Sequence, residues 1–587
     1  MNPMTSAETF GLLAPEITLV IAALIAFLGG AFAGLRSGWL VALLGIGAAL
    51  AVSGMQPTDG VALSGPVAID GFSVFVRWLV LLLGGLVALV QAGDTFRSAV
   101  INEPQPSHAT GEEAGTFLLL LAGLSLAGVA DDLVLLFAGL ELVSIPTALL
   151  LALKRTDAHG QEASLKYFFL SLVASSLFLY GVVCLYGIGG STHLGAIGDR
   201  LRSTDPGVVV IAAALVPLAI GLTLAGAAFR LAAFPLHFYA PDVYQGTSPG
   251  NAALLSTLPK LAGVVVLVRL VGLAIAPPTA PAVGYAAAAA LDLLWPAAAA
   301  LAAISMTIGN VMALRQSNLR RLLACSSIAH AGYLLVGIAS AAAAAAPGAT
   351  GLESGSMAAS AGGGATLFYL ATYAVATIGI FAALTYIGHR WPEWSATSAR
   401  PLREEANTVA DLEGLSGTNP VIAFTIAVCL LSLAGIPPLP GFWGKLSLAA
   451  AALQVDGGGW SPRRMAFVAL AVALVVNAAI AAAYYLRLIA AMYFRSTRRG
   501  VQTDGGIGAG VGMLACLALV AYFTVRPQGL FTAARRAGSV ALGGMPVSDA
   551  TERPVARQAS VATFSRAPPV LSTPPSAHPP LPPSATP

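Results

Sequence analysis

The sequence has few charged residues and little cysteine. Only 10% of its 587 residues are Asp, Glu, Lys or Arg, whereas an average soluble domain has about 25%. Hydrophobic residues make up 57% of the chain, and the mean hydropathy is +0.80. These values exclude an ordinary soluble domain and predict an all-α, polytopic membrane protein. A net charge of +3 with no basic domain also argues against a nucleic-acid partner.

The cysteines form no motif. There are four, each within an apolar run and far from the others: Cys184, Cys325, Cys429 and Cys516. No CxxC pair or metal-ligand spacing is present, so we expect small buried packing residues and no metal site.

Apolar runs of about 20 residues, the length needed to cross a bilayer core, recur almost from end to end. We predict fourteen spans: about 12–30, 37–54, 72–92, 114–130, 132–153, 163–188, 207–238, 249–274, 284–311, 320–343, 364–388, 419–452, 464–494 and 505–525. The first run lacks a basic n-region and a cleavage site, so we expect a retained helix. Lys and Arg concentrate after odd-numbered spans, which predicts that both termini are non-cytoplasmic.

Two regions do not fit a membrane span. Residues 344–363 are rich in small residues and are expected to form a loop. From about residue 540 the chain is rich in Pro and Ser, a composition that cannot build a core and predicts a disordered tail.

Lysine is the rarest basic residue. Of 30 basic residues only four are lysine: Lys154, Lys166, Lys260 and Lys445. The last three lie inside predicted spans. A buried lysine can release its proton near neutral pH, whereas an arginine stays protonated. Ionisable residues within the membrane mark ion or proton paths. Together with Glu141 and His330, these lysines are interpreted as a buried polar axis.

A structural interpretation of the same residues stays open. The charges could be pairs that hold helices together, for example Glu141 with Lys166 one helix later. Structural pairing alone does not favour Lys over Arg, which weighs against this for the whole set. His330 fits a satisfied core histidine as well as a relay member.

Proline interrupts two of the predicted spans in a similar way. "LAAFPLHF" (231–238) in the seventh span resembles "LAGIPPLP" (433–440) in the twelfth. "LKYFFLSLVASSLFLYG" in the sixth span likewise resembles "LFYLATYAVATIGIFAA" in the eleventh. A repeat offset by five helices is inverted in the membrane, and paired broken helices are typical of transporter ion sites. The breaks would let Lys445 reach water and a polar neighbour; a simple packing kink is the alternative.

Several segments in this order resemble one family closely: "FAGLELVSIPTALL", "EASLKYFFL", "AAFRLAAFPLHFYAPDVYQGTSP", "STLPKLA", "SMTIGNVMALRQSNLRRLLACSSIAHAGYLL", "LSLAGIPPLPGFWGKL" and "AAAYYLRLIAAMYF". They are similar to subunit N of bacterial proton-pumping NADH-quinone oxidoreductase, respiratory complex I. The resemblance covers about residues 12–535. Subunits L and M and the Mrp-type antiporters share this fold.

The resemblance implies fourteen helices in two inverted five-helix repeats, with discontinuous helices 7 and 12. It implies a proton path through Glu141, Lys166, Lys260, His330 and Lys445. It also implies a bacterial inner-membrane location beside subunit M and the small membrane subunits. No cofactor is expected in this chain, because the family's NADH, FMN, iron-sulfur and quinone sites are in partner subunits.

One residue departs from the family. Its usual seventh-helix lysine, "FKLS…P", is Arg230 in "FRLAAFP" here. Arginine can hardly release a proton. Either Arg230 is a fixed electrostatic part of the path, with Lys260 or Lys166 cycling, or this copy is a divergent paralogue.

These observations predict five regions: 1–111 (helices 1–3), 112–248 (first repeat, continuing into helix 8), 249–500 (helix 8 and second repeat), 501–535 (helix 14) and 536–587 (tail). The predicted function is proton translocation coupled to NADH oxidation and quinone reduction in other subunits. The alternatives are an Mrp-type sodium/proton antiporter subunit and a purely structural spacer.

Overall fold

The computed structural model describes residues 10–33, 37–56, 62–101, 107–154, 158–275, 284–349, 356–387, 389–390, 404–405, 407–457, 459–496, 501–503 and 505–543. All of them fall in one compact unit, Met1–Pro546. The second unit, Val547–Pro587, lies outside the described residues, and so does the predicted tail beyond residue 543.

The N-terminal part consists of helices and one hairpin: α2 (Ala14–Ala33), α3 (Gly38–Gly54), β1 (Ala62–Ser64), β2 (Val67–Ile69) and α4 (Gly71–Ile101). The strands pair antiparallel, Ala62 opposite Ile69. The middle part is α5 (Ser107–Val129), α6 (Leu133–Lys154), α7 (Ala158–Gly189), α8 (Leu194–Leu201), α9 (Pro206–Leu231), α10 (Ala240–Gly246) and α11 (Pro249–Ala274).

The C-terminal part is also helical: α12 (Tyr285–Leu314), α13 (Leu319–Ala345), α14 (Ser356–Ile387), η1 (Val409–Leu412), α15 (Leu415–Thr418), α16 (Pro420–Ala434), α17 (Pro440–Gln454), α18 (Pro462–Phe494), α19 (Gly506–Val525) and α20 (Pro527–Ala541). Three two-residue strands, β3 (His389–Arg390), β4 (Glu404–Glu405) and β5 (Val501–Gln502), form a small sheet in the order β4-β3-β5.

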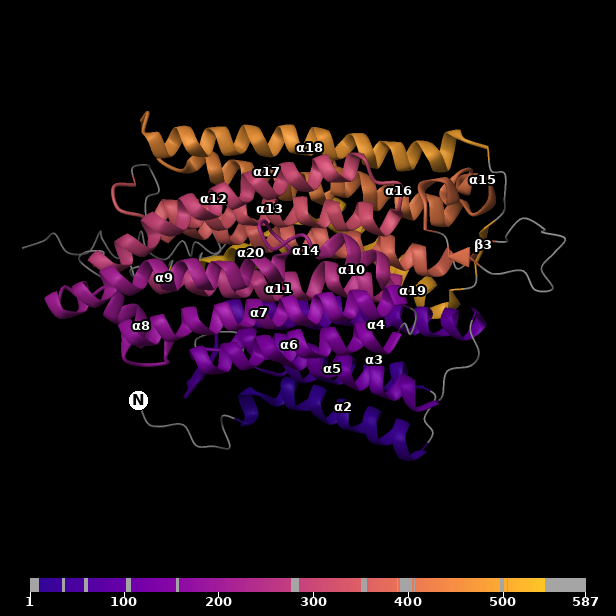
Figure 1. Cartoon of the computed structure of the whole chain (residues 1–587), viewed down its shortest axis with the longest axis horizontal. Coiled ribbons are helices and arrows are strands. Elements are labelled where there is room, and N and C mark those ends of the chain that lie inside the picture. Colours follow the sequence, from indigo (N-terminus) through magenta and orange to yellow (C-terminus); the bar gives the residue numbers. More distant parts are fainter. Residues whose placement is uncertain are drawn as a thin grey trace, which may run out of the picture. The chain divides into compact units, whose positions relative to one another are not determined.

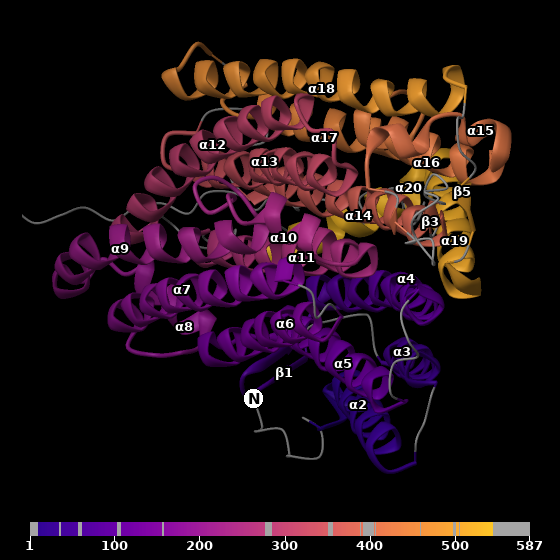
Figure 2. The ribbon, with the colours of Figure 1, turned by 45° about the vertical axis from the view of Figure 1, so that its right-hand side comes forward.

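The long helices run side by side, with α2 at one edge and α18 at the other (Figures 1 and 2). Among the described residues, twelve helices are long and apolar enough to cross a membrane, and α3 and α16 are shorter apolar helices. This confirms an all-α, multi-pass membrane protein. The count of fourteen spans and the inverted repeats stay predictions.

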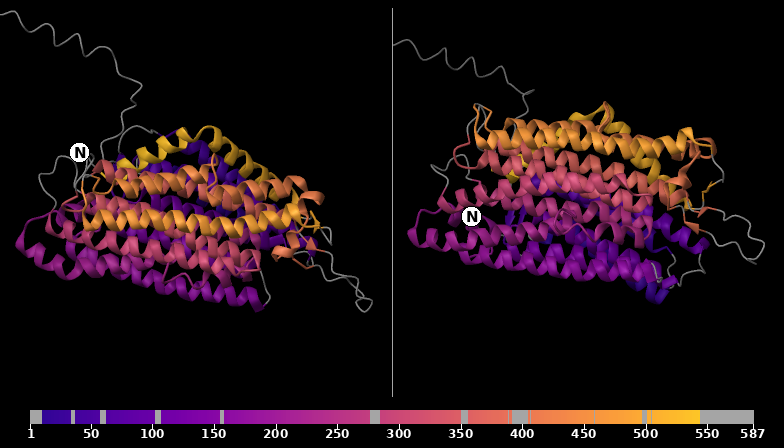
Figure 3. Two further views of the ribbon diagram at one scale, coloured as in Figure 1. Left: turned by 90° about the horizontal axis from the view of Figure 1, so that it is seen from above. Right: turned by 45° about the horizontal axis from the view of Figure 1, so that its top comes forward.

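The centre of the molecule is made by α11, α13 and α14. The apolar windows of α13 and α14 are completely buried by other helices, and that of α11 is 94% buried. Figure 3 shows the bundle of long helices from two further directions. Side chains on these three helices are therefore kept away from lipid, which a polar path requires.

Two predicted boundaries are wrong. The predicted loop 344–363 is shorter, because α14 begins at Ser356 and its glycines pack closely on other backbones. A Cβ at Gly362 would lie 2.6 Å from the carbonyl oxygen of Gly337. The predicted tail also begins too early, because α20 continues to Ala541, with Ala537 and Gly538 buried. Residues 350–355 lie outside the described part.

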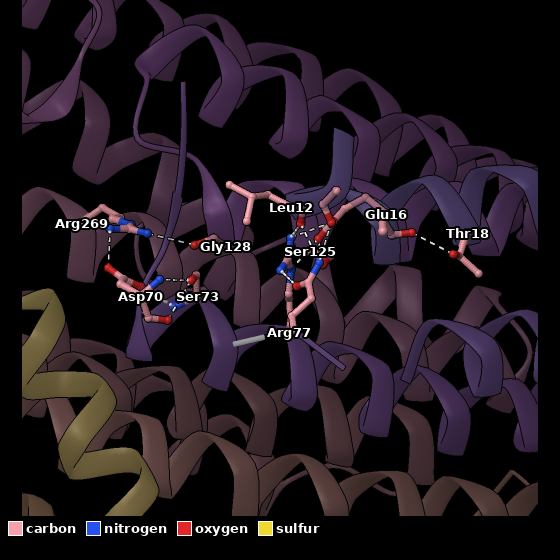
Figure 4. A network of polar contacts seen from close by, with 12 residues as sticks. Leu12, Glu16, Thr18, Asp70, Ser73, Arg77, Ser125, Gly128 and Arg269 are labelled. Carbon is pink, nitrogen blue, oxygen red and sulfur yellow. Dashed lines mark hydrogen bonds and ion pairs between the residues drawn. The ribbon is translucent and has the colours of Figure 1, made fainter. Parts of the chain in front are cut away.

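An ion pair that the sequence analysis did not anticipate joins the N-terminal helices (Figure 4). Arg77 on α4 donates from Nε and Nη2 to the two carboxylate oxygens of Glu16, each at 2.8 Å. It also donates to Gln56 and to the carbonyl of Leu12, while Ser125 donates to Glu16 at 2.5 Å. Four segments thus meet at one buried pair of a guanidinium and a carboxylate.

A second contact nearby ties these helices to α11. Arg269 donates to the carbonyl of Gly128 at 2.9 Å and lies 3.6 Å from the carboxylate of Asp70 (Figure 4). Asp70 in turn exchanges hydrogen bonds with Ser73 at the start of α4. Asp70 directly follows strand β2, so this contact also joins the β1–β2 hairpin to α11.

Replacing Arg77 by Met should destabilise the protein by about 3–5 kcal/mol, because Glu16 would be left buried without its cation. The measurement is the thermal unfolding temperature of the purified protein. The double variant Glu16→Gln, Arg77→Met is the control and should recover much of the loss. An unchanged unfolding temperature in Arg77→Met would contradict a structural role for the pair.

Candidate functional site

The first helix break releases a carbonyl beside a buried lysine. Helix α9 ends at Leu231, where Ala232 has a left-handed backbone with φ of 56°. Pro235 follows and has no N–H to continue the helix. The side chain of Lys260, on the fully buried face of α11, donates from Nζ to the carbonyl of Leu231.

The second break repeats this arrangement. Helix α16 ends at Ala434, and Gly435 adopts φ of 85°. Lys445 on α17 donates from Nζ to the carbonyls of Leu433 at 2.8 Å and Ala434 at 3.0 Å. Its Nζ also lies 4.8 Å from the centre of the Tyr333 ring.

Each buried lysine therefore binds the carbonyl end of a broken helix. The last carbonyls of a helix have no partner within the helix and carry partial negative charge. Unpaired carbonyls inside a membrane protein are costly unless a donor meets them. The prolines thus create acceptors, and the ammonium groups of Lys260 and Lys445 satisfy them.

Glu141 and Arg230 form the polar cluster beside the first break. The Arg230 Nη2 lies 3.4 Å from Glu141 Oε1, and Nη1 donates to Ser144 Oγ at 2.6 Å and to the carbonyl of Leu140 at 3.1 Å. Ser175 donates to the same Glu141 oxygen at 2.5 Å. Arg230 is buried, while 23% of the Glu141 side chain is exposed. This geometry fits a fixed charge pair.

His330 on α13 lies among tyrosines. Its Nδ1 is 2.5 Å from the hydroxyl of Tyr369, and its Nε2 is 3.1 Å from that of Tyr485. The ring of Tyr373 is 4.6 Å from the imidazole. The ring of Tyr333 lies between His330 and Lys445, with its centre 5.6 Å from that of the imidazole and 4.8 Å from Lys445 Nζ. The histidine is therefore connected through this ring to the lysine of the second break.

The hydroxyl groups around His330 extend into a wider network. Tyr373 donates to Ser327 at 3.0 Å, and the Tyr244 hydroxyl is 3.3 Å from the same Ser327 oxygen. On the other side, Tyr484 donates to Asn310 at 3.0 Å, and Asn310 donates to Asn477 at 3.1 Å.

These residues were not predicted from the sequence, because their side chains are uncharged and do not stand out in an apolar run. Tyrosines recurring in the apolar runs "LFYLATYAV" and "AAAYYLRL" were the available signal.

The prediction that Lys166 is a buried axis residue is wrong. Its side chain is 38% exposed and pairs with Glu162 at 2.7 Å and with Asp242 at 3.0 Å, not with Glu141. It lines a polar cavity of about 340 Å³. His159 in the first turn of α7 also lines this cavity, and Glu162, one turn before Lys166, draws the ammonium outward. Lys166 is therefore separate from the two helix breaks.

Comparison with known proteins identifies the family. Residues 130–460 match the family model described as NADH:quinone oxidoreductase/Mrp antiporter, TM. The chain is 34% identical over 495 residues to NADH-quinone oxidoreductase subunit N of Anaeromyxobacter sp. (strain Fw109-5), covering 82% of this chain and 86% of that protein. The chain belongs to the NADH:quinone oxidoreductase/Mrp antiporter family. This confirms the resemblance inferred from its motifs.

Solved structures agree on the architecture. A chain of respiratory complex I from Thermus thermophilus with bound aureothin is 28% identical, with a TM-score of 0.64 over 88% of this chain and 98% of that one. A chain of the Mrp complex from Dietzia sp. DQ12-45-1b gives a TM-score of 0.63 at 20% identity, over 90% and 97%. The second likeness shows the family fold alone.

The described residues contain no group of three or more His, Cys, Asp or Glu side chains that could hold a metal ion. Cys184, Cys325, Cys429 and Cys516 are free and buried.

Replacing Tyr485 by Phe should lower the unfolding temperature, because His330 and Ser326 both lose a buried partner. Leaving a buried polar group unsatisfied costs about 1–3 kcal/mol. Tyr493→Phe on the same helix is the matched control, since Tyr493 is exposed. Equal unfolding temperatures for the two variants would show that the His330 contacts are unimportant.

Proposed function

We propose that this chain is an antiporter-like membrane subunit of an NADH-quinone oxidoreductase and that it translocates protons. NADH oxidation and quinone reduction take place in other subunits, which also hold the FMN, the iron-sulfur clusters and the quinone. The observation that carries the proposal is the pair of buried lysines, each donating to the carbonyl end of a broken helix. Family membership supports the assembly.

The geometry suits a lysine that gains and loses its proton. In the charged form, the ammonium of Lys445 is stabilised by two carbonyls and by the face of Tyr333. In the neutral form, the amine still donates a hydrogen bond but loses the charge attraction. Each proton transfer therefore changes how strongly the two halves of the broken helix are held together.

The path we propose runs from Lys260 through His330 to Lys445. The ring of Tyr333 contacts both His330 and the ammonium of Lys445, and the two imidazole nitrogens contact the hydroxyls of Tyr369 and Tyr485. Imidazole and phenol groups can pass a proton by donating and accepting in turn. Because like charges repel across a buried interior, a proton on one lysine disfavours a proton on the other. Quinone chemistry elsewhere would drive this equilibrium.

Arg230 has a fixed electrostatic role in this proposal. Its guanidinium makes bonds to Ser144, to Leu140 and to Glu141, and it stays charged at any physiological pH. The proton that moves in the first half is then the one on Lys260. Glu141 keeps its importance as the partner that holds Arg230 in place.

The family also supports the remaining assignments. We infer a bacterial inner-membrane location, both termini on the non-cytoplasmic side, and subunit M and the small membrane subunits as neighbours. Regions 1–111, 112–248, 249–500 and 501–535 would then be the N-terminal helices, the two inverted repeats and helix 14.

An Mrp-type sodium/proton antiporter subunit is the second candidate, because the matching family model covers both groups. Gentle purification of the tagged chain from native membranes separates the two. We expect NADH:quinone reductase activity, flavin and iron-sulfur absorbance to copurify. Purification without redox partners, together with sodium-dependent proton exchange in vesicles, would contradict the main proposal.

Replacing Lys445 or Glu141 by Ala should reduce coupled proton pumping several-fold while the complex still assembles. Ser447→Ala on α17 is the control, because the Ser447 hydroxyl donates to the carbonyl of Gly444 in the same helix and not to the break. The measurement is the number of protons moved per electron in sealed vesicles. An unchanged ratio in both variants would contradict the path.

Replacing Arg230 tests its fixed role. Arg230→Lys keeps a cation near Glu141 and should retain most of the pumping. Arg230→Gln removes the charge, leaves Glu141 without its cation and should reduce pumping by at least the same factor as Glu141→Ala. Full activity in Arg230→Gln, measured as the proton-to-electron ratio, would rule out the electrostatic role.

A further inference from the structure

The polar cavity around Lys166 draws its lining from distant parts of the chain. It has a volume of about 340 Å³, room for several water molecules. Its walls include residues of α7, α10, the start of α13 and the segment before η1: His159, Glu162, Lys166, Asp242, Gln245, Asn318, Arg320, Arg321 and Asn407. The cavity therefore lies where the middle and C-terminal parts of the chain meet.

Asp242 is the link across this cavity. Its Oδ2 accepts from Lys166 Nζ at 3.0 Å, and its Oδ1 accepts from Arg321 Nη1 at 2.7 Å. Lys166 belongs to α7 and Arg321 to α13, whereas Asp242 lies on α10 between them. One carboxylate thus holds α10 to both of its neighbours.

Further contacts hold the same short helix at its end. Arg321 also donates to Gln245 at 2.8 Å. Arg320 donates to the carbonyl of Thr247, the residue that directly follows α10, and to Asn407 at 2.8 Å. The polar contacts between α10 and α13 therefore depend on two adjacent arginine side chains.

Helix α10 depends on such contacts for its position. It has only seven residues, too few to be stable alone in water. On one side it follows the break after Leu231, and on the other it is separated from α11 by Thr247 and Ser248. It packs mainly on α7 and α13. Loss of the ion pairs would free it to shift.

The inner side of α10 meets the buried hydroxyl network. Tyr244 is buried, and its hydroxyl is 3.3 Å from Ser327, which accepts from Tyr373 at 3.0 Å. The ring of Tyr373 contacts His330. On the outer side, Asp242 and Gln245 line the cavity. Helix α10 therefore separates the cavity from the network that leads to His330.

We propose that α10 is a gate between this cavity and the buried network, and that Asp242 is the latch that keeps it closed. Water in the cavity would supply the proton, and separation of Asp242 from Lys166 and Arg321 would let α10 move aside. Lys166 then acts at the entrance of the proton path, in the cavity, and not in the buried polar axis. The inference rests on the proposed proton translocation.

The test measures how fast a water-soluble reagent reaches the broken segment between α9 and α10. A cysteine is introduced at Ala233, a fully buried position in the break whose own side chain makes no polar contact. The assembled complex in sealed vesicles is treated with a membrane-impermeant maleimide from the cavity side. In Asp242→Asn we expect the labelling rate of this cysteine to rise at least tenfold. We also expect proton leakage to rise in the absence of NADH.

Glu162→Gln is the matched control. It removes the other carboxylate that pairs with Lys166 but leaves the bonds of Asp242 to Lys166 and Arg321 in place, so labelling should stay at the wild-type rate. If Asp242→Asn does not assemble, Arg321→Gln and Lys166→Met each remove one of the two ion pairs of Asp242 and should give intermediate rates.

If all of these variants are labelled at the wild-type rate, the proposal that α10 is a gate is wrong. The labelling result does not require pumping, so it stands apart from a failure of the Lys260 and Lys445 path.

Discussion

The bond between a buried ammonium and the carbonyl end of a broken helix is the interaction on which the rest of this structure depends. Without the lysines, the breaks at Leu231 and Ala434 would leave carbonyls unpaired in the membrane interior. Without the breaks, the lysines would have no acceptor in an apolar region. The lysines and the broken helices therefore stabilise each other. Together they place an ammonium group that can lose its proton inside the helix bundle.

The surrounding helices follow from this requirement. A charged side chain in the membrane must be covered by protein, and α11, α13 and α14 are the helices most completely enclosed by the others. The outer helices, α2 and α18 at the edges, expose many more apolar side chains. The Glu16–Arg77 pair fixes the N-terminal helices to one another without taking part in the lysine sites.

Much of this arrangement is readable from the sequence, because membrane helices and proline breaks have strong local signals. The positions of α9, α11, α16 and α17 follow from apolar length, Pro235, Pro437 and the glycine at 435. The sequence does not show in which direction a side chain points from its helix. Lys166 lies in an apolar run, yet Glu162 and Asp242 draw it to a surface cavity. Neither the tyrosines around His330 nor the bidentate pair of Glu16 with Arg77 follows from spacing, since both depend on which helices become neighbours.

The central claim is that Lys260 and Lys445 carry protons and do not merely neutralise carbonyls. The double variant Lys260→Arg, Lys445→Arg separates these roles, because arginine keeps the positive charge and the hydrogen-bond donors but does not release its proton. The decisive measurement is the number of protons moved per electron by the assembled complex in sealed vesicles. The account predicts normal assembly with a reduced ratio, whereas an unchanged ratio would contradict it.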